Sequence, residues 1–362
     1  MDVIKVGLLG FGTIGAGVAK ILLEKADLIE RTNGKRIELV KICDKDLTSD
    51  RGVTVPPGVL TDNISEIMDN PEISIVVELF GGVEPARTFV LRALESGKNV
   101  VTANKALIAN CGPELFAKAR ELGRTIGFEA SVCGGIPVLQ SIQTSLQANR
   151  IESIQAIVNG TCNFILSEME SKGTAYVDAV KEAQRLGFAE ANPTLDVDGS
   201  DSTLAKVTNA INGINIVGDS VGSVFYQGWG AGRYPTASAV CSDVIDCALG
   251  RAKITFDALR LWSDEREGAP VMDPKKIKGC AYLRFTVEDR PGVMAALSSA
   301  LGKRQISIAS MLQHEKSDAN DPYASVIIMT HAAPAEALDD AIAELNEAPF
   351  VRGKAVRLAV RD

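Results

Sequence analysis

The feature that most constrains the fold is a glycine cluster near the N-terminus, Gly10-Phe11-Gly12-Thr13-Ile14-Gly15. It joins an apolar run, Val3–Leu9, to a stretch with helical periodicity. A strand, a tight glycine turn and a helix form the context in which G-x-G-x-x-G binds a dinucleotide. Gly10 suits the turn, Gly12 lets backbone approach a pyrophosphate, and Gly15 lets the helix pack closely on the strand. The cluster therefore predicts dinucleotide binding, and a plain tight turn is the alternative.

Apolar runs alternate with helix-like stretches through the first part of the chain. The runs are Val3–Leu9, Ile37–Cys43, Ile75–Phe80, Asn99–Thr102 and Thr125–Phe128, and the helix-like stretches include Pro85–Ser96 and Pro113–Leu122. Buried strands that alternate with helices are typical of a parallel sheet covered on both faces. We therefore expect residues 1–130 to form a Rossmann-type, doubly wound dinucleotide-binding domain.

An acidic residue, Asp44, follows the second apolar run. An acidic side chain at this point can hold the ribose hydroxyls of NAD. Lys45 comes next and could instead favour the 2′-phosphate of NADP, so the sequence leaves the choice between the two cofactors open. A turn residue at the end of a strand is an equally acceptable interpretation of Asp44.

The rest of the chain divides into two further regions. Residues 131–270 carry Gly, Asn, Asp and Thr turns around short apolar segments and a helix-like stretch, Tyr176–Leu186, which predicts an α+β domain. A helix near residues 235–250 is expected to pack back on the first domain. From residue 278 to 362 the pattern is strand, helix, strand, strand, helix, strand, the order of a ferredoxin-like domain. Its Asp289–Gly292 turn could bind a small molecule at a helix N-terminus or could be a simple capped turn.

Composition excludes several classes of function. The net charge of −8 argues against a nucleic-acid partner, and no apolar run approaches the roughly 18 residues of a membrane helix. Seven cysteines without metal-ligand spacing indicate thiols in a reducing compartment, so we expect a cytoplasmic protein. The two histidines are His314 and His331. Proton transfer in the first two-thirds of the chain therefore needs Lys, Asp, Glu, Tyr or Cys.

Taken together, the motifs resemble the homoserine dehydrogenases over most of the chain. The matching stretches are Gly10–Gly15, Val77–Gly82, Thr102–Ala106, Glu129–Val132, Gly134–Pro137, Asn159–Asn163, Gly187–Glu190, Asp196–Asp201 and Gly230–Ser238. The segment Val287–Val293 resembles an ACT domain, a module that often senses amino acids. The resemblance implies reversible, NAD- or NADP-dependent conversion of L-aspartate 4-semialdehyde to L-homoserine in threonine, methionine and isoleucine biosynthesis. It also implies an amino-acid effector, threonine in the usual case, and a homodimer or homotetramer.

The resemblance also implies roles for individual residues. Lys105 follows the fourth strand, where its ammonium group can donate a proton to the oxygen that gains charge as hydride arrives. Glu190 and Asp201 match the carboxylates that hold the substrate's amino group, and Asp201 also belongs to the catalytic set. Further matches are Thr102, Lys105, Gly81, Gly187 and Gly232 for the cofactor, and Glu129, Val132, Gly134 and Ile136 for a monovalent cation such as Na⁺.

The chain departs from the family pattern after Asp201. The family has a second lysine four residues later, usually assigned as the proton donor, where this chain has Ala205. Lys206 falls one position further on, a rotation of about 100° on a helix. The segment Leu204–Asn215 resembles a much later part of the family sequence, so several dozen residues of the substrate domain are expected to be missing near positions 199–204.

The gap leaves several alternatives open. Residues could be missing from the sequence as given, the deletion could be engineered, or it could be natural with altered activity. The alternative function is a catalytically silent regulator that binds a dinucleotide and an amino acid. A further alternative is a dehydrogenase of related architecture that acts on another small aldehyde. Glu190 and Asp201 argue against this function, because a substrate without an amino group would leave both carboxylates unpaired.

Overall fold

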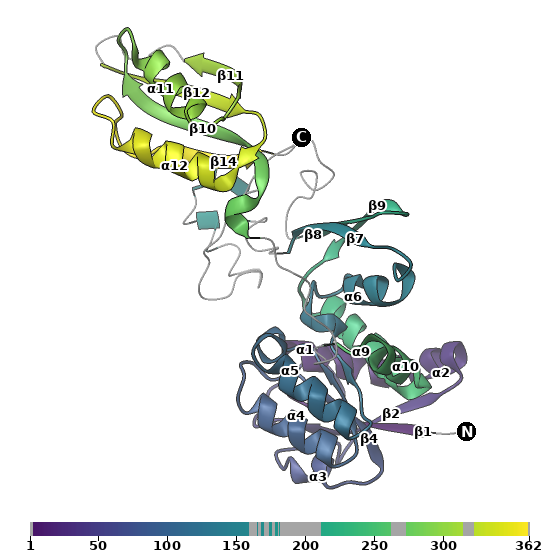
Figure 1. Ribbon diagram of the computed structural model, residues 1–362. Helices are drawn as coiled ribbons and strands as arrows, with labels where there is room; N and C mark the ends of the chain where they lie inside the picture. The colour runs from purple at the N-terminus through teal and green to yellow at the C-terminus, as the bar shows by residue number, and fades with distance from the viewer. Residues whose placement is uncertain are drawn as a thin grey trace. The chain divides into compact units, whose positions relative to one another are not determined.

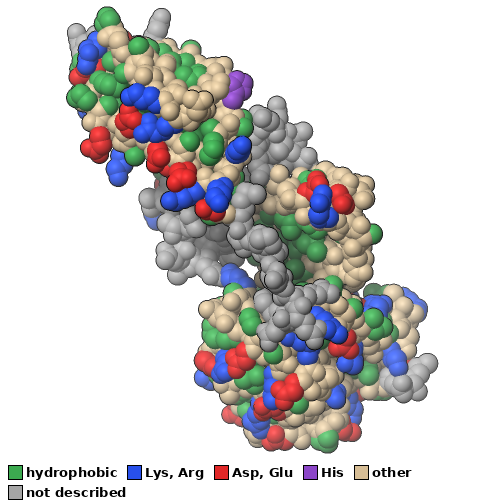
Figure 2. Space-filling model, in the orientation of Figure 1, with side chains coloured by type: hydrophobic (Ala, Val, Ile, Leu, Met, Phe, Trp, Pro, Cys, Tyr) green, Lys and Arg blue, Asp and Glu red, His purple; other side chains and the backbone are tan. Residues whose placement is uncertain are grey.

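The computed structural model describes residues 3–158, 211–261, 273–313 and 322–360, and a few single residues between 165 and 181. The chain forms two compact units, residues 1–195 with 207–268 and residues 196–206 with 269–362 (Figure 1). No helix among the described residues is long and apolar enough to cross a membrane. On the face drawn in Figure 2, acidic and basic side chains are interspersed over both units.

The first unit contains a parallel sheet of six strands in the order β3-β2-β1-β4-β5-β6. The strands are β1 (Val3–Leu9), β2 (Arg36–Cys43), β3 (Leu60–Thr61), β4 (Ile73–Glu78), β5 (Asn99–Thr102) and β6 (Ile126–Gly127). The chain runs outward from β1 to β3 and then returns to place β4 on the other side of β1. This doubly wound topology confirms the predicted Rossmann-type fold, and in such sheets ligands bind at the carboxyl ends of the strands where the order reverses.

Helices cover both faces of this sheet. They are α1 (Thr13–Glu24), α2 (Ala26–Asn33), α3 (Ser65–Met68), α4 (Ala86–Glu95), α5 (Lys105–Glu121), α9 (Arg233–Leu249) and α10 (Arg251–Leu259). One core joins α1 and α9 to the sheet, with Val18, Val240 and Val244 packed in the same cluster as Leu8. The other core holds α4, α5 and α10, with Phe116 stacked on Phe256.

The helix α9 crosses α1 closely because Gly17 has no side chain. A Cβ at position 17 would lie 2.8 Å from the carbonyl oxygen of Arg233 and 2.9 Å from the Cβ of Ala237. A segment more than two hundred residues downstream therefore completes the core of the N-terminal sheet.

A smaller antiparallel sheet lies in the same unit. It consists of β7 (Ile151–Ile157), β8 (Ile211–Gly218) and β9 (Gly222–Trp229) in that order. Ile214 and Ile216 of β8 pack against Ile136, Val138 and Leu146, which belong to the segment around α6 (Val138–Gln140) and the π-helical turn Ser141–Ser145. The predicted helix at residues 176–186 lies mostly outside the described residues.

The second unit has the predicted βαββαβ order. Its elements are β10 (Lys278–Glu288), α11 (Val293–Gly302), β11 (Ile308–Gln313), β12 (Tyr323–Thr330), β13 (Ala333–Pro334), α12 (Ala335–Asn346) and β14 (Val356–Val360), after a 3₁₀ turn at Pro274–Lys276. The strands pair antiparallel, with β12 and β14 on either side of β10. Alternate residues of β12 are buried, and Val326 and Ile328 share a core with Leu297 and Leu338 of the two helices.

Candidate active site

The glycine turn between β1 and α1 has the geometry that the sequence predicts. Gly10 has φ +96°, which favours glycine, and a Cβ at Gly15 would lie 2.0 Å from the carbonyl oxygen of Gly10. A Cβ at Gly12 would meet nothing within 4 Å. Gly12 is also the N-cap of α1, and no side chain caps that helix. Gly10 and Gly15 are thus required by the fold itself. Gly12 instead leaves open space beside the backbone N–H groups at the start of α1, which no side chain caps and which suit a phosphate.

Asp44 links the end of β2 to this turn. Its Oδ2 accepts a hydrogen bond from the Phe11 amide at 2.5 Å, and its Oδ1 accepts one from the Asp46 amide at 2.9 Å. Two cationic side chains lie close by: Arg51 donates to Asp46 at 2.8 Å, and Arg233 donates to the carbonyl of Arg51 at 2.6 Å. The carboxylate therefore helps to shape the turn, and its neighbourhood carries both signs of charge.

The carboxyl ends of β4 and β5 carry the next group of predicted residues. Asn104 caps α5 by accepting a hydrogen bond from the Leu107 amide at 3.0 Å, which places Lys105 in the exposed first turn of the helix. Thr102 is fully buried, and its hydroxyl donates to Glu78 at 2.6 Å. Any contact of Thr102 with a cofactor would therefore come through its main chain. Gly81 is exposed, and a Cβ there would meet nothing within 4 Å.

The loop predicted to hold a cation is built from glycines in close contact. A Cβ at Gly134, which has φ +56°, would lie 2.3 Å from the carbonyl oxygen of Gly230, and a Cβ at Gly228 would lie 3.2 Å from Ile136. Val132 and Ile136 pack in the same small core. Gly232, with φ +115°, is the N-cap of α9. The structure thus brings the 132–136 loop and the Gly230–Gly232 segment together.

Two observations bear on whether this loop fits a cation. The carboxylate of Glu129 accepts hydrogen bonds from the amides of Leu139 at 3.0 Å and Gln140 at 2.7 Å, so it caps α6 rather than pointing into open space. Asn212, 1% exposed, pairs with Gly228 across the sheet, and its Oδ1 has no hydrogen-bond partner among the described residues. Asn212 lies against Gly230, which in turn contacts Gly134 of the predicted cation loop. Its buried oxygen without a partner suits a bound ion or water, so the residues present fit a monovalent cation.

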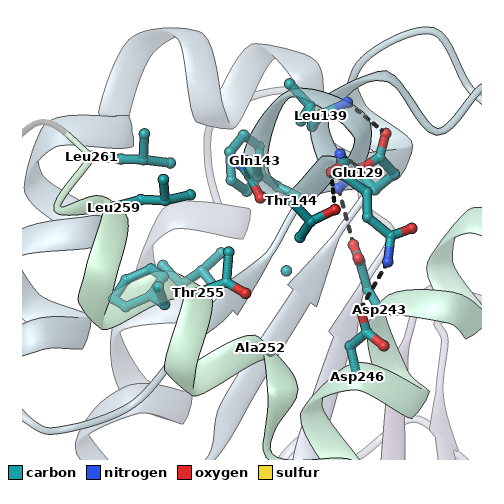
Figure 3. Close-up of a pocket in the computed structure, with 15 residues that line it drawn as sticks. Glu129, Leu139, Gln143, Thr144, Asp243, Asp246, Ala252, Thr255, Leu259 and Leu261 are labelled. Atoms are coloured by element: carbon teal, nitrogen blue, oxygen red, sulfur yellow. Dashed lines mark hydrogen bonds between the residues drawn. The ribbon is translucent and has the colours of Figure 1, made fainter. Parts of the chain in front are cut away.

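A pocket that the sequence analysis missed lies beside Glu129 (Figure 3). It has a volume of about 70 Å³ and is lined by Glu129, Asp243 and Asp246 on one side and by apolar side chains such as Phe256 and Leu259 on the other. Asp243 Oδ2 accepts a hydrogen bond from the Glu129 amide at 2.9 Å. Burial raises the pKa of Asp243 to about 8, and the charges of Glu129 and Asp246 add to the shift.

Nothing in the sequence separates Asp243 from Asp246, since both lie on the helix that the pattern predicts near residues 235–250 and that the structure shows as α9. Among the described residues, no group of three His, Cys, Asp or Glu side chains is arranged to hold a metal ion. The predicted residues Gly187, Glu190 and Asp201 lie outside the described residues, as does the join at 199–204.

Models of three families match this chain. They are "Homoserine dehydrogenase, NAD binding domain" at residues 10–129, "Homoserine dehydrogenase" at residues 137–204 and 200–245, and "ACT domain" at residues 281–350. The homoserine dehydrogenase of Pseudomonas aeruginosa is 35% identical and is aligned over 99% of both chains. The chain belongs to the homoserine dehydrogenase family.

Solved structures of homoserine dehydrogenases have the same fold. That from Thiobacillus denitrificans is 33% identical, with a TM-score of 0.86 over 100% of this chain and 99% of that chain. A hyperthermophilic archaeal homoserine dehydrogenase in complex with NADPH is 26% identical, with a TM-score of 0.59 over 69% of this chain and 98% of that chain. The family membership and fold predicted from the motifs are therefore confirmed, whereas the individual site residues stay predictions.

The comparisons also bear on the gap. The alignment with the Pseudomonas enzyme runs over 435 positions and this chain has 362 residues, so at least 73 positions have no counterpart here. The homoserine dehydrogenase model matches in two pieces that meet at residues 200–204. The chain therefore lacks an internal segment of its family at the position where the motifs break off.

Proposed function

We propose that this chain catalyses the NAD(P)-dependent, reversible reduction of L-aspartate 4-semialdehyde to L-homoserine, in threonine, methionine and isoleucine biosynthesis. The observation that carries the proposal is that the open glycine turn, Asp44 and Lys105 all lie at the carboxyl ends of one Rossmann-type sheet in a member of this family. This is the edge at which such sheets bind dinucleotides.

The bound nicotinamide would supply or accept the hydride. Lys105, in the first turn of α5, would donate a proton to the substrate oxygen as charge develops on it. Glu190 and Asp201 would hold the substrate's ammonium group by charge-assisted hydrogen bonds, which fix its orientation as well as its affinity. The amide groups at the start of α1 would hold the pyrophosphate.

The ribose end supports either cofactor. The Asp44 carboxylate favours free ribose hydroxyls, whereas Lys45 and Arg51 favour a 2′-phosphate. The neighbour solved with NADPH supports a nicotinamide dinucleotide without deciding between NADP and NAD for this chain.

The remaining parts have supporting roles in this proposal. Residues 1–130 bind the dinucleotide, residues 131–270 form the substrate and dimerisation domain, and residues 278–362 form an ACT domain. A monovalent cation such as Na⁺ would hold the dinucleotide-binding domain and the substrate domain together. Its ligands would be the carbonyls of Glu129, Val132, Gly134 and Ile136. An amino acid, threonine in the simplest case, would regulate the cytoplasmic homodimer or homotetramer through the ACT domain.

The test is homoserine-dependent reduction of NAD and of NADP, with and without threonine. Turnover with one cofactor establishes the activity, and inhibition by threonine identifies the effector. A second candidate, a silent regulator that binds the dinucleotide and an amino acid, is favoured by the break in the family match at residues 200–204. Saturable NADPH binding without any homoserine-dependent turnover would support that candidate and refute the enzyme.

A further inference from the structure

Glu78 is the last residue of β4 and lies in the middle of the sheet, between Leu9 of β1 and Thr102 of β5. It is 0% exposed, which is unusual for a glutamate. The neighbouring strands β1 and β4 are the pair between which the strand order reverses. A buried carboxyl at this point lies directly behind the edge proposed to bind the dinucleotide.

The carboxyl oxygens of Glu78 accept short hydrogen bonds from two different segments, the loop after β4 and the end of β5. Oε1 accepts from the amide of Phe80 at 2.6 Å, and Oε2 accepts from the hydroxyl of Thr102 at 2.6 Å. Burial raises the pKa of Glu78, and the hydrogen bonds from Thr102, Phe80 and Asn104 oppose the shift. The side chain thus bridges the segment after β4 and the segment after β5.

The bridge closes into a ring through Asn104. The backbone amide of Asn104 donates to the Thr102 hydroxyl at 3.0 Å. The side-chain Nδ2 of Asn104 donates to the carbonyls of Phe80 at 3.1 Å and Gly82 at 2.7 Å. Asn104 is also the N-cap of α5, the helix that begins with Lys105. The ring therefore joins the Gly81–Gly82 loop to the first turn of α5.

The same loop touches the glycine turn. The Leu79 amide donates to the carbonyl of Leu9 at 2.9 Å, and a Cβ at Gly10 would lie 3.0 Å from the carbonyl oxygen of Leu79. Three backbone segments at the cofactor edge, the glycine turn, the Gly81–Gly82 loop and the start of α5, are thus held in one arrangement.

We propose that Glu78 is a positioning residue that fixes the Gly81–Gly82 loop against the first turn of α5, so that this loop and Lys105 form one preorganised surface for the nicotinamide half of the cofactor. The inference rests on the proposed dinucleotide site. It adds a residue that touches neither cofactor nor substrate and acts through Thr102 and Asn104.

The first test is the affinity for NADPH of the full chain, measured by fluorescence titration well below the melting temperature. Glu78→Ala removes the bridge and should weaken binding about tenfold or more. Glu78→Gln keeps the shape, accepts from the Phe80 amide and donates to the Thr102 oxygen, so it should bind within about threefold of the wild type. Glu84→Ala, which changes an exposed glutamate of the same loop, is the matched control and should bind like the wild type.

If Glu78→Ala does not fold, Thr102→Val carries the test, because it removes one arm of the bridge at almost constant volume. It should weaken NADPH binding by about threefold or more. A lower melting temperature with unchanged affinity in either variant would show a merely structural role and would overturn the proposal.

The second test does not depend on the cofactor. Hydrogen exchange of the apo protein, measured by mass spectrometry, should speed up in Glu78→Ala in both peptides, residues 79–84 and 103–108, and not in Glu84→Ala. Faster exchange in only one peptide would contradict the coupling between the two segments. If the wild type binds neither NADPH nor NADH, the proposed function fails, while the exchange result still decides whether Glu78 joins the segments.

Discussion

Replacement of Asp243 by asparagine should stabilise the first unit, and the stabilisation should grow as the pH rises from 5 to 8. Asp243 has a pKa raised to about 8 by burial, against 3.8 in an exposed carboxyl. Between these values the folded chain keeps a proton that the unfolded chain has lost. The contribution of this group to the free energy of unfolding is therefore complete below about pH 4 and is lost as the pH rises through 8.

The size of the effect follows from the same pKa. A carboxyl protonated only in the folded state changes the free energy of unfolding by about 1.4 kcal/mol per pH unit, so the interval from pH 5 to pH 8 corresponds to about 4 kcal/mol at most. Asparagine has no charge to bury, and its Oδ1 can still accept the hydrogen bond from the Glu129 amide. For a unit of this size each kcal/mol shifts the melting temperature by about 2–4 °C, so the difference in melting temperature between Asp243→Asn and the wild type should grow by about 10 °C from pH 5 to pH 8.

Tryptophan fluorescence is a suitable assay, because Trp229 lies in β9 of the first unit. Melting curves at pH 5, 6, 7 and 8 would be compared for the wild type, Asp243→Asn and Asp257→Asn, the last being an exposed carboxylate of α10. The Asp257 variant should differ from the wild type by the same small amount at every pH. A stabilisation by Asp243→Asn that does not grow with pH would refute the assignment of a buried, protonated carboxyl.

Further predictions concern the turn, the lysine and the loop. Gly12→Ala should melt like the wild type but bind NADPH about tenfold more weakly. Gly15→Ala should lower the melting temperature, because its Cβ would meet the Gly10 carbonyl. Equal melting temperatures and equal NADPH affinities of the two variants would contradict this reasoning. Lys105→Met should lower kcat for homoserine oxidation by about 10²–10⁴-fold with a much smaller change in NADPH affinity, and unchanged turnover would exclude its role as proton donor. Sodium chloride should raise the melting temperature of the wild type above that in choline chloride. The buried Oδ1 of Asn212 is expected to join the four carbonyls around the cation, so Asn212→Ala should reduce this increment. An equal increment in both proteins would show that Asn212 does not contact the cation.

The sheet was predictable because burial on both faces leaves continuous apolar runs. The run Val3–Leu9 coincides with β1. The predicted strand Ile75–Phe80 was wrong at both ends, since β4 spans Ile73–Glu78. The chain leaves the sheet after Glu78 because the carboxyl of that residue binds the Phe80 amide, which sequence periodicity does not reveal.

The helix α5 shows a different limit of sequence reasoning. The pattern predicted a helix-like stretch only from Pro113 to Leu122. The structure extends it from Lys105 to Glu121 with Pro113 inside, and Asn104 caps the start. Asparagine is a favoured N-cap residue, so Asn104 was a signal for this start that the prediction did not use. The contacts of Glu78, Asn212 and Asp243 were equally invisible, because each depends on segments that are distant in sequence.

The position of the gap separates the two halves of the proposed chemistry. It falls between β7 and β8, within the part that carries Glu190 and Asp201, and the chain then returns through β9 to α9. The apolar face of α9, with Ala237, Val240 and Val244, completes the core that covers α1 and β1. Since the helix downstream of the gap still reaches that core, the glycine turn keeps its support whatever the missing segment does to substrate binding. Cofactor affinity should therefore survive in this chain even if homoserine turnover does not, and loss of both together would mean that the gap disturbs the N-terminal sheet itself.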